Sequence, residues 1–128
     1  MVFSRHVSLV IDGNTAVQVV VSFQEQEAEP DEFRIAIYPH SNDLAPMAES
    51  VWHVREKNGS FQLQIFTQSI VTGICLAGCL ASVVAGAGPL VECLKKAKTR
   101  ADVRKCIDTN AVAQVVASLS CIYGCLSL

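Results

Sequence analysis

Six cysteines constrain the fold of this chain more than any other feature. They fall in the last 54 of 128 residues with the spacing C-x3-C-x13-C-x12-C-x14-C-x3-C. The residue numbers of the outermost, middle and innermost pairs sum to 200, 200 and 199, so the pairs share a centre near residue 100. This mirror order predicts disulfides nested across an antiparallel helical hairpin. The predicted pairs are Cys75–Cys125, Cys79–Cys121 and Cys93–Cys106.

Two uncharged arms and a charged tip support this hairpin, which we assign to residues 67–128. No charged residue occurs from Asn58 to Val91 or from Thr109 to Leu128. Each arm of about 20 residues is long enough to cross a bilayer. Six basic side chains between the arms form a cationic tip, which anionic lipid headgroups would attract. They are Lys95, Lys96, Lys98, Arg100, Arg104 and Lys105.

Residue types at the tip indicate where the second helix begins. Thr99 is followed three residues later by Asp102, the pattern of a capping box, so a helix should start near Arg100. This start coincides with the centre of the cysteine mirror. Pro89 should open a new helical turn within the first arm, because a proline cannot continue a preceding helix.

The first half, residues 1–66, shows the two-residue alternation of β-strands. In "TAVQVVVSF" and "FRIAIY" the apolar residues that share a face are Val17, Val19, Val21 and Phe23, and Phe33, Ile35 and Ile37. Alternation of this kind is typical of a sheet that is packed on one face and wetted on the other. We expect an antiparallel meander of four or five strands, and therefore an α+β fold.

Two turn signals set the register of this meander. Asp12-Gly13-Asn14 and Asn58-Gly59 supply residues that tolerate positive φ. Pairing outward from Asn58-Gly59 places Val54 opposite Leu63 and Trp52 opposite Ile65, with polar pairs between them. The hairpin should therefore have one apolar and one polar face.

Two other states of the cysteines compete with disulfides. Reduced cysteines can serve as small buried core residues. A zinc site is a poorer interpretation, because C-x2-C pairs are absent and the histidines, His6, His40 and His53, all lie in the other half. The mirror order favours disulfides over both, and neither a metal nor a cofactor is expected.

Charge and motif content argue against nucleic-acid binding and catalysis. Residues 1–57 hold nine acidic and four basic residues and the remainder holds three and six, so an overall basic face is absent. Aromatic residues that could stack on bases make up only 6%. His40-Ser41-Asn42-Asp43 and His53 lack an accompanying nucleophile elbow, phosphate loop or metal motif. We expect a protein that is not an enzyme.

The cysteine pattern over residues 75–125 resembles that of saposin-like proteins, which join six cysteines first to sixth, second to fifth and third to fourth. That resemblance implies action on lipids and membranes. The chain also resembles bacteriocin precursors of the halocin group, in which a cysteine-rich, Gly/Ala-rich apolar segment follows a polar N-terminal part. This second resemblance, carried by composition, implies an antimicrobial module.

These features predict a membrane-directed, bacteriocin-like toxin whose residues 67–128 contact a lipid membrane. The alternative is a non-catalytic binding or carrier protein, in which the sheet contacts a partner protein or helps to enclose an apolar ligand. The arms can also be simply the buried core of a small α+β protein, packed on the apolar face of the sheet. These interpretations are not exclusive, because a packed hairpin can later be released.

Cysteine usage and the N-terminus point to different compartments. Clustered cysteines indicate an oxidising compartment. The N-terminal "MVFSRHVSLVIDG" is not a secretory signal, since its apolar run ends at Ile11 and Asp12 follows directly. We therefore expect export without a standard signal peptide, or release by cleavage from a cytoplasmic precursor.

Overall fold

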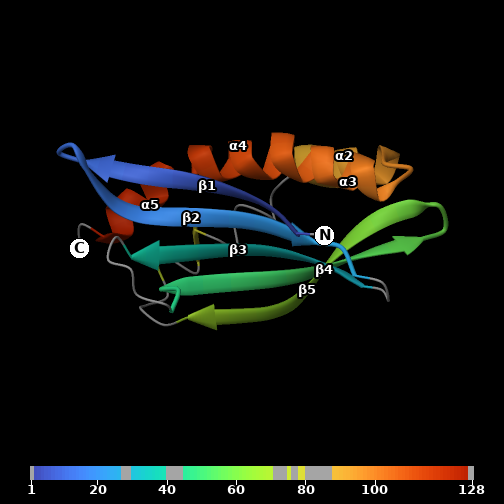
Figure 1. The fold of residues 1–128 in the computed structure, drawn as a ribbon, viewed down its shortest axis with the longest axis horizontal. Helices are drawn as coiled ribbons and strands as arrows, with labels where there is room; N and C mark the ends of the chain where they lie inside the picture. The colour runs from blue at the N-terminus through green and yellow to red at the C-terminus, as the bar shows by residue number, and fades with distance from the viewer. Residues whose placement is uncertain are drawn as a thin grey trace.

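The computed structural model describes residues 2–26, 30–39, 45–70, 75, 78–79 and 88–126. Five strands come first along the chain and helices follow (Figure 1). The strands are β1 (Val2–Ile11), β2 (Asn14–Gln24), β3 (Asp31–Pro39), β4 (Ala48–Lys57) and β5 (Ser60–Ile70). The helical elements are α2 (Gly88–Lys96), α3 (Arg100–Cys106), the π-helical segment η1 (Ile107–Ala111), α4 (Val112–Ala117) and α5 (Leu119–Leu126).

The five strands form one antiparallel sheet in the order β1-β2-β3-β4-β5, so each strand pairs with its neighbour in sequence. This is the predicted meander, and the predicted α+β class is confirmed. Two tight turns explain the β1–β2 and β4–β5 hairpins. Asp12 and Gly13 have φ values of 53° and 79°, and Asn58 and Gly59 have 55° and 80°. Asx-Gly pairs adopt such values at low cost, and the twist of this turn matches that of the strands.

The register of the β4–β5 hairpin agrees with the prediction from the sequence. Val54 lies opposite Leu63, Arg55 opposite Gln62 and Trp52 opposite Ile65. The register then shifts at a bulge between Val51 and Trp52. β5 continues to Ile70, past the boundary that the sequence predicts at Phe66.

One hydrophobic core lies between the sheet and the helices, which Figure 1 shows gathered on one side of the strands. The inward sheet face includes the residues expected from alternation, Val17, Val19, Val21, Phe23, Phe33, Ile35 and Ile37, which are all at most 2% exposed. The helices contribute Leu90, Leu94, Val103, Ile107, Ala111, Val115 and Ile122, which are at most 1% exposed. The described helices are therefore packed on the apolar face of the sheet, and both layers share this core.

The helical layer is a hairpin whose second arm is bent. Pro89 lies in the first turn of α2, where its missing N–H costs nothing. The second arm runs without interruption from Arg100 to Ala117 through η1, and Ser118 then separates α4 from α5. The Ser118 hydroxyl donates to the carbonyl of Val115 at 2.8 Å, so the side chain satisfies a backbone group where the helix breaks.

Candidate functional site

Three disulfides staple the helical layer in the nested order that the spacing predicts. They join Cys75 to Cys125, Cys79 to Cys121 and Cys93 to Cys106, with Cα–Cα distances of 5.7, 6.0 and 5.7 Å. These distances lie in the usual range for disulfides, and the bridges hold the two arms in contact. None of the three bonds reaches the sheet, so every covalent cross-link lies within residues 75–125.

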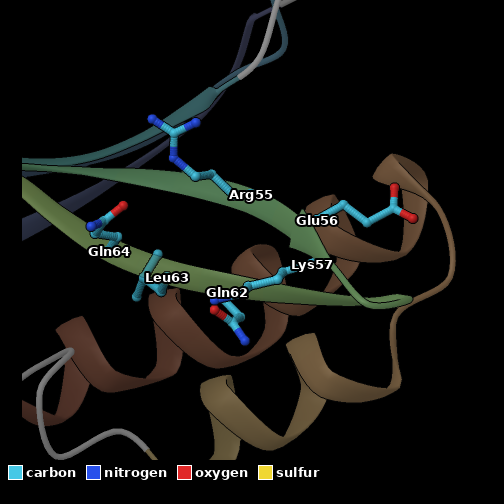
Figure 2. Close-up of a pocket in the computed structure, with 6 residues that line it drawn as sticks. All are labelled: Arg55, Glu56, Lys57, Gln62, Leu63 and Gln64. Carbon is cyan, nitrogen blue, oxygen red and sulfur yellow. The ribbon is translucent and has the colours of Figure 1, made fainter.

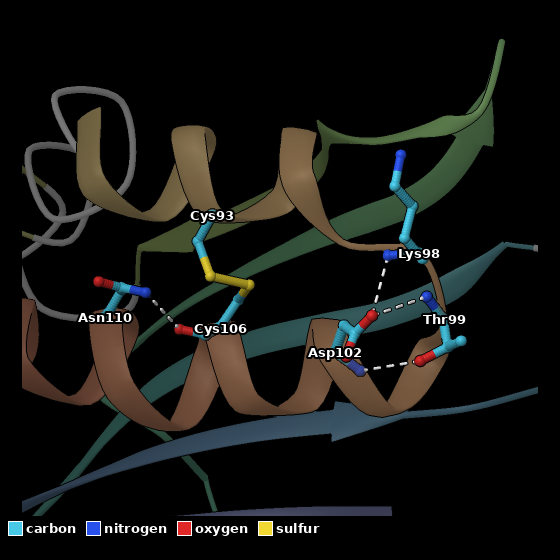
Figure 3. Close-up of a disulfide and its surroundings, with 6 residues drawn as sticks. All are labelled: Cys93, Lys98, Thr99, Asp102, Cys106 and Asn110. Atoms are coloured by element: carbon cyan, nitrogen blue, oxygen red, sulfur yellow. Dashed lines mark hydrogen bonds between the residues drawn. A yellow bond between two sulfur atoms is a disulfide. The ribbon is translucent and has the colours of Figure 1, made fainter.

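The innermost bridge differs in surroundings from the other two. Cys106 is buried in the core and Cys93 packs against it, so this bond joins α2 to α3 close to the sheet (Figure 3). In the outer two bridges Cys75 and Cys121 are exposed, whereas Cys79 is only 1% exposed. The Sγ atoms of Cys79 and Cys125, which belong to different bridges, are 3.6 Å apart. The two outer bridges therefore lie side by side.

A capping box sets the turn between the arms, as the sequence predicts. The backbone N–H of Asp102 donates to the Thr99 hydroxyl at 3.2 Å (Figure 3). The Asp102 carboxylate accepts the N–H groups of Lys98 and Thr99 at 3.0 and 3.2 Å. Chiefly the Lys98 N–H, with help from Thr99, holds the pKa of Asp102 below its ordinary value, because these bonds stabilise the charged form. The cap fixes the helix start at Arg100 and so aligns the cysteines of the two arms.

The six basic residues of the cationic tip fall into two groups. Lys95, Lys96, Lys98 and Lys105 are exposed, and the Lys95 ammonium lies 3.5 Å from Glu92 one turn away. Arg100 and Arg104 are instead only partly exposed and point to the sheet. In the folded chain, two of the six cations predicted to meet lipid are thus engaged in contacts with the sheet.

Three ion pairs between the layers form what we call the interlayer clasp. They are Asp31–Arg100 at 2.9 Å, Glu25–Arg104 at 2.8 Å and Arg5–Asp108 at 2.8 Å. The carboxylate of Asp31 is 4% exposed and also accepts the N–H of Gln26, while Arg100 donates to the Gln26 carbonyl. Arg5 further lies over the ring of Phe3, 4.5 Å from its centroid. All three pairs gather on α3 and the start of η1.

Sequence reasoning did not identify the clasp, although a signal for it exists. The acidic residues lie mostly in the first half and the basic residues mostly in the second, with Glu25 and Asp31 in the acidic run from Glu25 to Glu32. Opposite charges on two halves of one compact chain favour pairing between the halves. Which acid meets which base depends on the fold.

The polar residues considered for catalysis do not converge where the structure describes them. His6 lies on the outer face of β1 and His53 on the outer face of β4, with β2 and β3 between them. His40, Ser41, Asn42 and Asp43 lie outside the described residues. Neither histidine is near the cysteines in the fold, since the helices occupy the opposite face of the sheet.

Two surface hollows are lined by polar as well as apolar groups. One of about 420 Å³ lies along the β4–β5 hairpin (Figure 2) and is lined by Arg55, Glu56, Lys57, Gln62, Leu63 and Gln64. A smaller one of about 210 Å³ lies between Phe3 of β1 and the α3 face that carries Arg104 and Lys105. The charged and amide groups of the first hollow do not suit a wholly apolar ligand.

Within the described residues, no single helix is both long and apolar enough to cross a membrane. The run Arg100–Ala117 together with Leu119–Cys125, bent by 41° at the break, does reach the required length and composition. Comparisons of the chain with models of known protein families, with curated proteins and with solved structures return no match.

Proposed function

We propose that the chain is a membrane-directed, bacteriocin-like toxin whose stapled helical layer is the active part and whose sheet is its cover. The observation that carries this proposal is the confinement of all three disulfides to residues 75–125. The helical layer is cross-linked within itself, whereas apart from the backbone that follows β5 its contacts with the sheet are non-covalent. It can therefore separate from the sheet as one closed unit.

The face that the sheet covers is the face that would enter lipid. Its side chains, among them Leu94, Ile107 and Ile122, are fully buried against the strands. Burial of a large aliphatic side chain is worth about 1.5–3 kcal/mol, whether the apolar surroundings are a sheet or acyl chains. In water the two layers stay together, because separation would expose both apolar faces. A bilayer offers the helical layer an equivalent environment, which water does not.

The interlayer clasp provides the control that such a cover needs. Arg100 and Arg104 are tied to Asp31 and Glu25 in the closed form. Opening the clasp returns both guanidinium groups to the cationic tip, where each contributes about 1 kcal/mol of attraction to anionic lipid. The three disulfides suit an oxidising, extracellular location. Export without a standard signal, or cleavage between the layers, would bring the protein there.

The test removes the acidic side of the clasp and leaves every cation in place. Asp31→Asn with Glu25→Gln frees two arginines, so binding to anionic vesicles should tighten by up to about 30-fold at about 1 kcal/mol per arginine. The matched control is Glu32→Gln with Glu49→Gln, which removes the same charge from acids that flank Arg34 on the sheet, away from α3. Vesicle binding and dye release are measured for both variants and the parent. Equal binding by the variant and its control would refute the proposal.

The alternative is a non-catalytic binding protein that uses the outer face of the sheet. No described helix covers this face, and Arg34 there lies 3.9 Å from Glu32 and 3.5 Å from Glu49. A sheet face with such a charge network suits a partner protein better than a wholly apolar ligand. This function becomes the leading one if neither the clasp variant nor the parent binds vesicles of any charge.

A further inference from the structure

Three sulfur atoms converge where the two outer bridges lie side by side, and the fourth, that of Cys75, is bonded to one of them. Cys75 and Cys79 come from one arm and Cys121 and Cys125 from α5. The Sγ atoms of Cys79, Cys121 and Cys125 all lie within 4.8 Å of one another, and Cys75 is bonded to one of them. Each arm supplies its pair through a C-x3-C spacing, which places both sulfurs on one helix face.

The distance between the two bridges suits a tetrahedral metal ion. Zinc binds thiolate at about 2.3 Å, so the sulfurs of a regular four-thiolate site are about 3.8 Å apart. The Sγ atoms of Cys79 and Cys125 are already 3.6 Å apart. The sulfurs of each bridge would have to separate from about 2.0 Å to about 3.8 Å, a movement within reach of rotation about the Cα–Cβ bonds.

We propose that, when these two bridges are reduced, Cys75, Cys79, Cys121 and Cys125 bind one Zn²⁺ ion. Each disulfide accepts two electrons and two protons from a dithiol reductant, which is itself oxidised to a disulfide. Four thiols result, and they release four protons when their sulfurs bind the metal as thiolates. The zinc-bound and disulfide forms exclude each other, and either one ties α5 to the first arm.

Two of the four cysteines of this site are more accessible than those of the third bridge. Cys75 and Cys121 are exposed, so a small reductant and a metal ion can reach the four-sulfur cluster. Cys93–Cys106 crosses between α2 and α3 near the capped turn, and Cys106 is only 3% exposed. The histidines, the other common zinc ligands, belong to the sheet half. The zinc site thus needs no residue outside the C-x3-C pairs. The proposal does not depend on what the helical layer does at a membrane.

The full chain is reduced with a dithiol, and the dithiol is then removed in the absence of oxygen. The reduced protein is titrated first with Co²⁺ and then with Zn²⁺. One equivalent of Co²⁺ should give the absorption of a tetrahedral four-thiolate site, and Zn²⁺ should displace it. Cys79→Ser with Cys121→Ser should weaken Zn²⁺ binding by more than about 100-fold, since loss of outer-shell partners alone costs 10–100-fold. Cys93→Ser with Cys106→Ser is the matched control and should keep the site.

Circular dichroism keeps the test decisive if reduction unfolds the chain. Zinc should then restore the helical signal at one equivalent, because metal binding contributes directly to folding. The oxidised protein should show no thiolate absorption with Co²⁺. The proposal is overturned if reduced parent protein gives no four-thiolate spectrum, if zinc fails to restore helix to an unfolded reduced chain, or if the Cys79/Cys121 variant binds as tightly as the control variant.

Discussion

Nesting of the disulfides changes how much each should stabilise the fold. Cys75–Cys125 has a sequence separation of 50 and Cys93–Cys106 one of 13. Taken singly, the loop-closure relation gives about 4.1 kcal/mol for the outer bridge and about 3.0 kcal/mol for the inner bridge at 25 °C. On sequence separation alone, the outer bridge should therefore matter more by about 1 kcal/mol.

The middle bridge removes that advantage. With Cys79–Cys121 intact, the outer bridge closes only residues 75–79 and 121–125 of the unfolded chain. A loop of about ten residues corresponds to about 2.7 kcal/mol in the same relation. Loss of the outer bridge should therefore cost no more than loss of the inner bridge, which also removes sulfur atoms from the core.

Urea unfolding of two variants checks this ordering. One is Cys75→Ala with Cys125→Ala and the other Cys93→Ala with Cys106→Ala, each with its remaining bridges verified by peptide mapping. Parallel measurements on fully reduced parent and variants give the part of each change that comes from packing. This part is subtracted from the loss in unfolding free energy of each variant. If the remaining loss is larger for the Cys75/Cys125 variant than for the Cys93/Cys106 variant by about 1 kcal/mol or more, the bridges act independently and the reasoning is refuted.

Three further outcomes follow from the clasp and the cap. Arg100→Leu should destabilise the fold by about 1–3 kcal/mol in urea unfolding, because the buried carboxylate of Asp31 loses its charged partner while it keeps the N–H of Gln26; Lys96→Leu, an exposed control, should change stability little. Thr99→Ala should cost about 1 kcal/mol of the unfolding free energy, since the hydroxyl no longer accepts the N–H of Asp102. The lowered pKa of Asp102 means that its charge stabilises the folded chain above the ordinary value of 3.8, and that this contribution is lost as pH falls through the lower folded value. Asp102→Asn should therefore lower the melting temperature at neutral pH and match the parent at a pH below both values; a difference that persists there would refute the assignment.

Local features of the fold were predictable because single residues decide them. Asn58 and Gly59 tolerate positive φ, and a two-residue turn leaves one register for the strands that it joins. Thr99 and Asp102 specify a helix start through bonds within one turn. The nested disulfide order required only two arms of equal length. In each case the partners are close in sequence or related by a simple symmetry.

Features that depend on distant contacts were not predictable. Arg5 and Asp108 are 103 residues apart, and their pairing follows only after β1 and the second arm are packed together. The bulge between Val51 and Trp52 breaks the two-residue count, so extrapolation from the turn fails beyond it. The π-helical segment Ile107–Ala111 carries no sequence signal that differs from an α-helix. Tertiary packing selects all three.

The sequential order of the strands has a consequence for synthesis on the ribosome. Every strand pairs with its immediate neighbour, so the sheet can form as soon as β5 has emerged, without waiting for any later residue. Translation of residues 71–126 then takes roughly 3–11 s at about 5–20 residues per second. For that interval the inward side chains of the strands have nothing to pack on. The nascent chain is therefore most open to aggregation before its helices arrive, and each helical arm meets a preformed apolar template as it emerges.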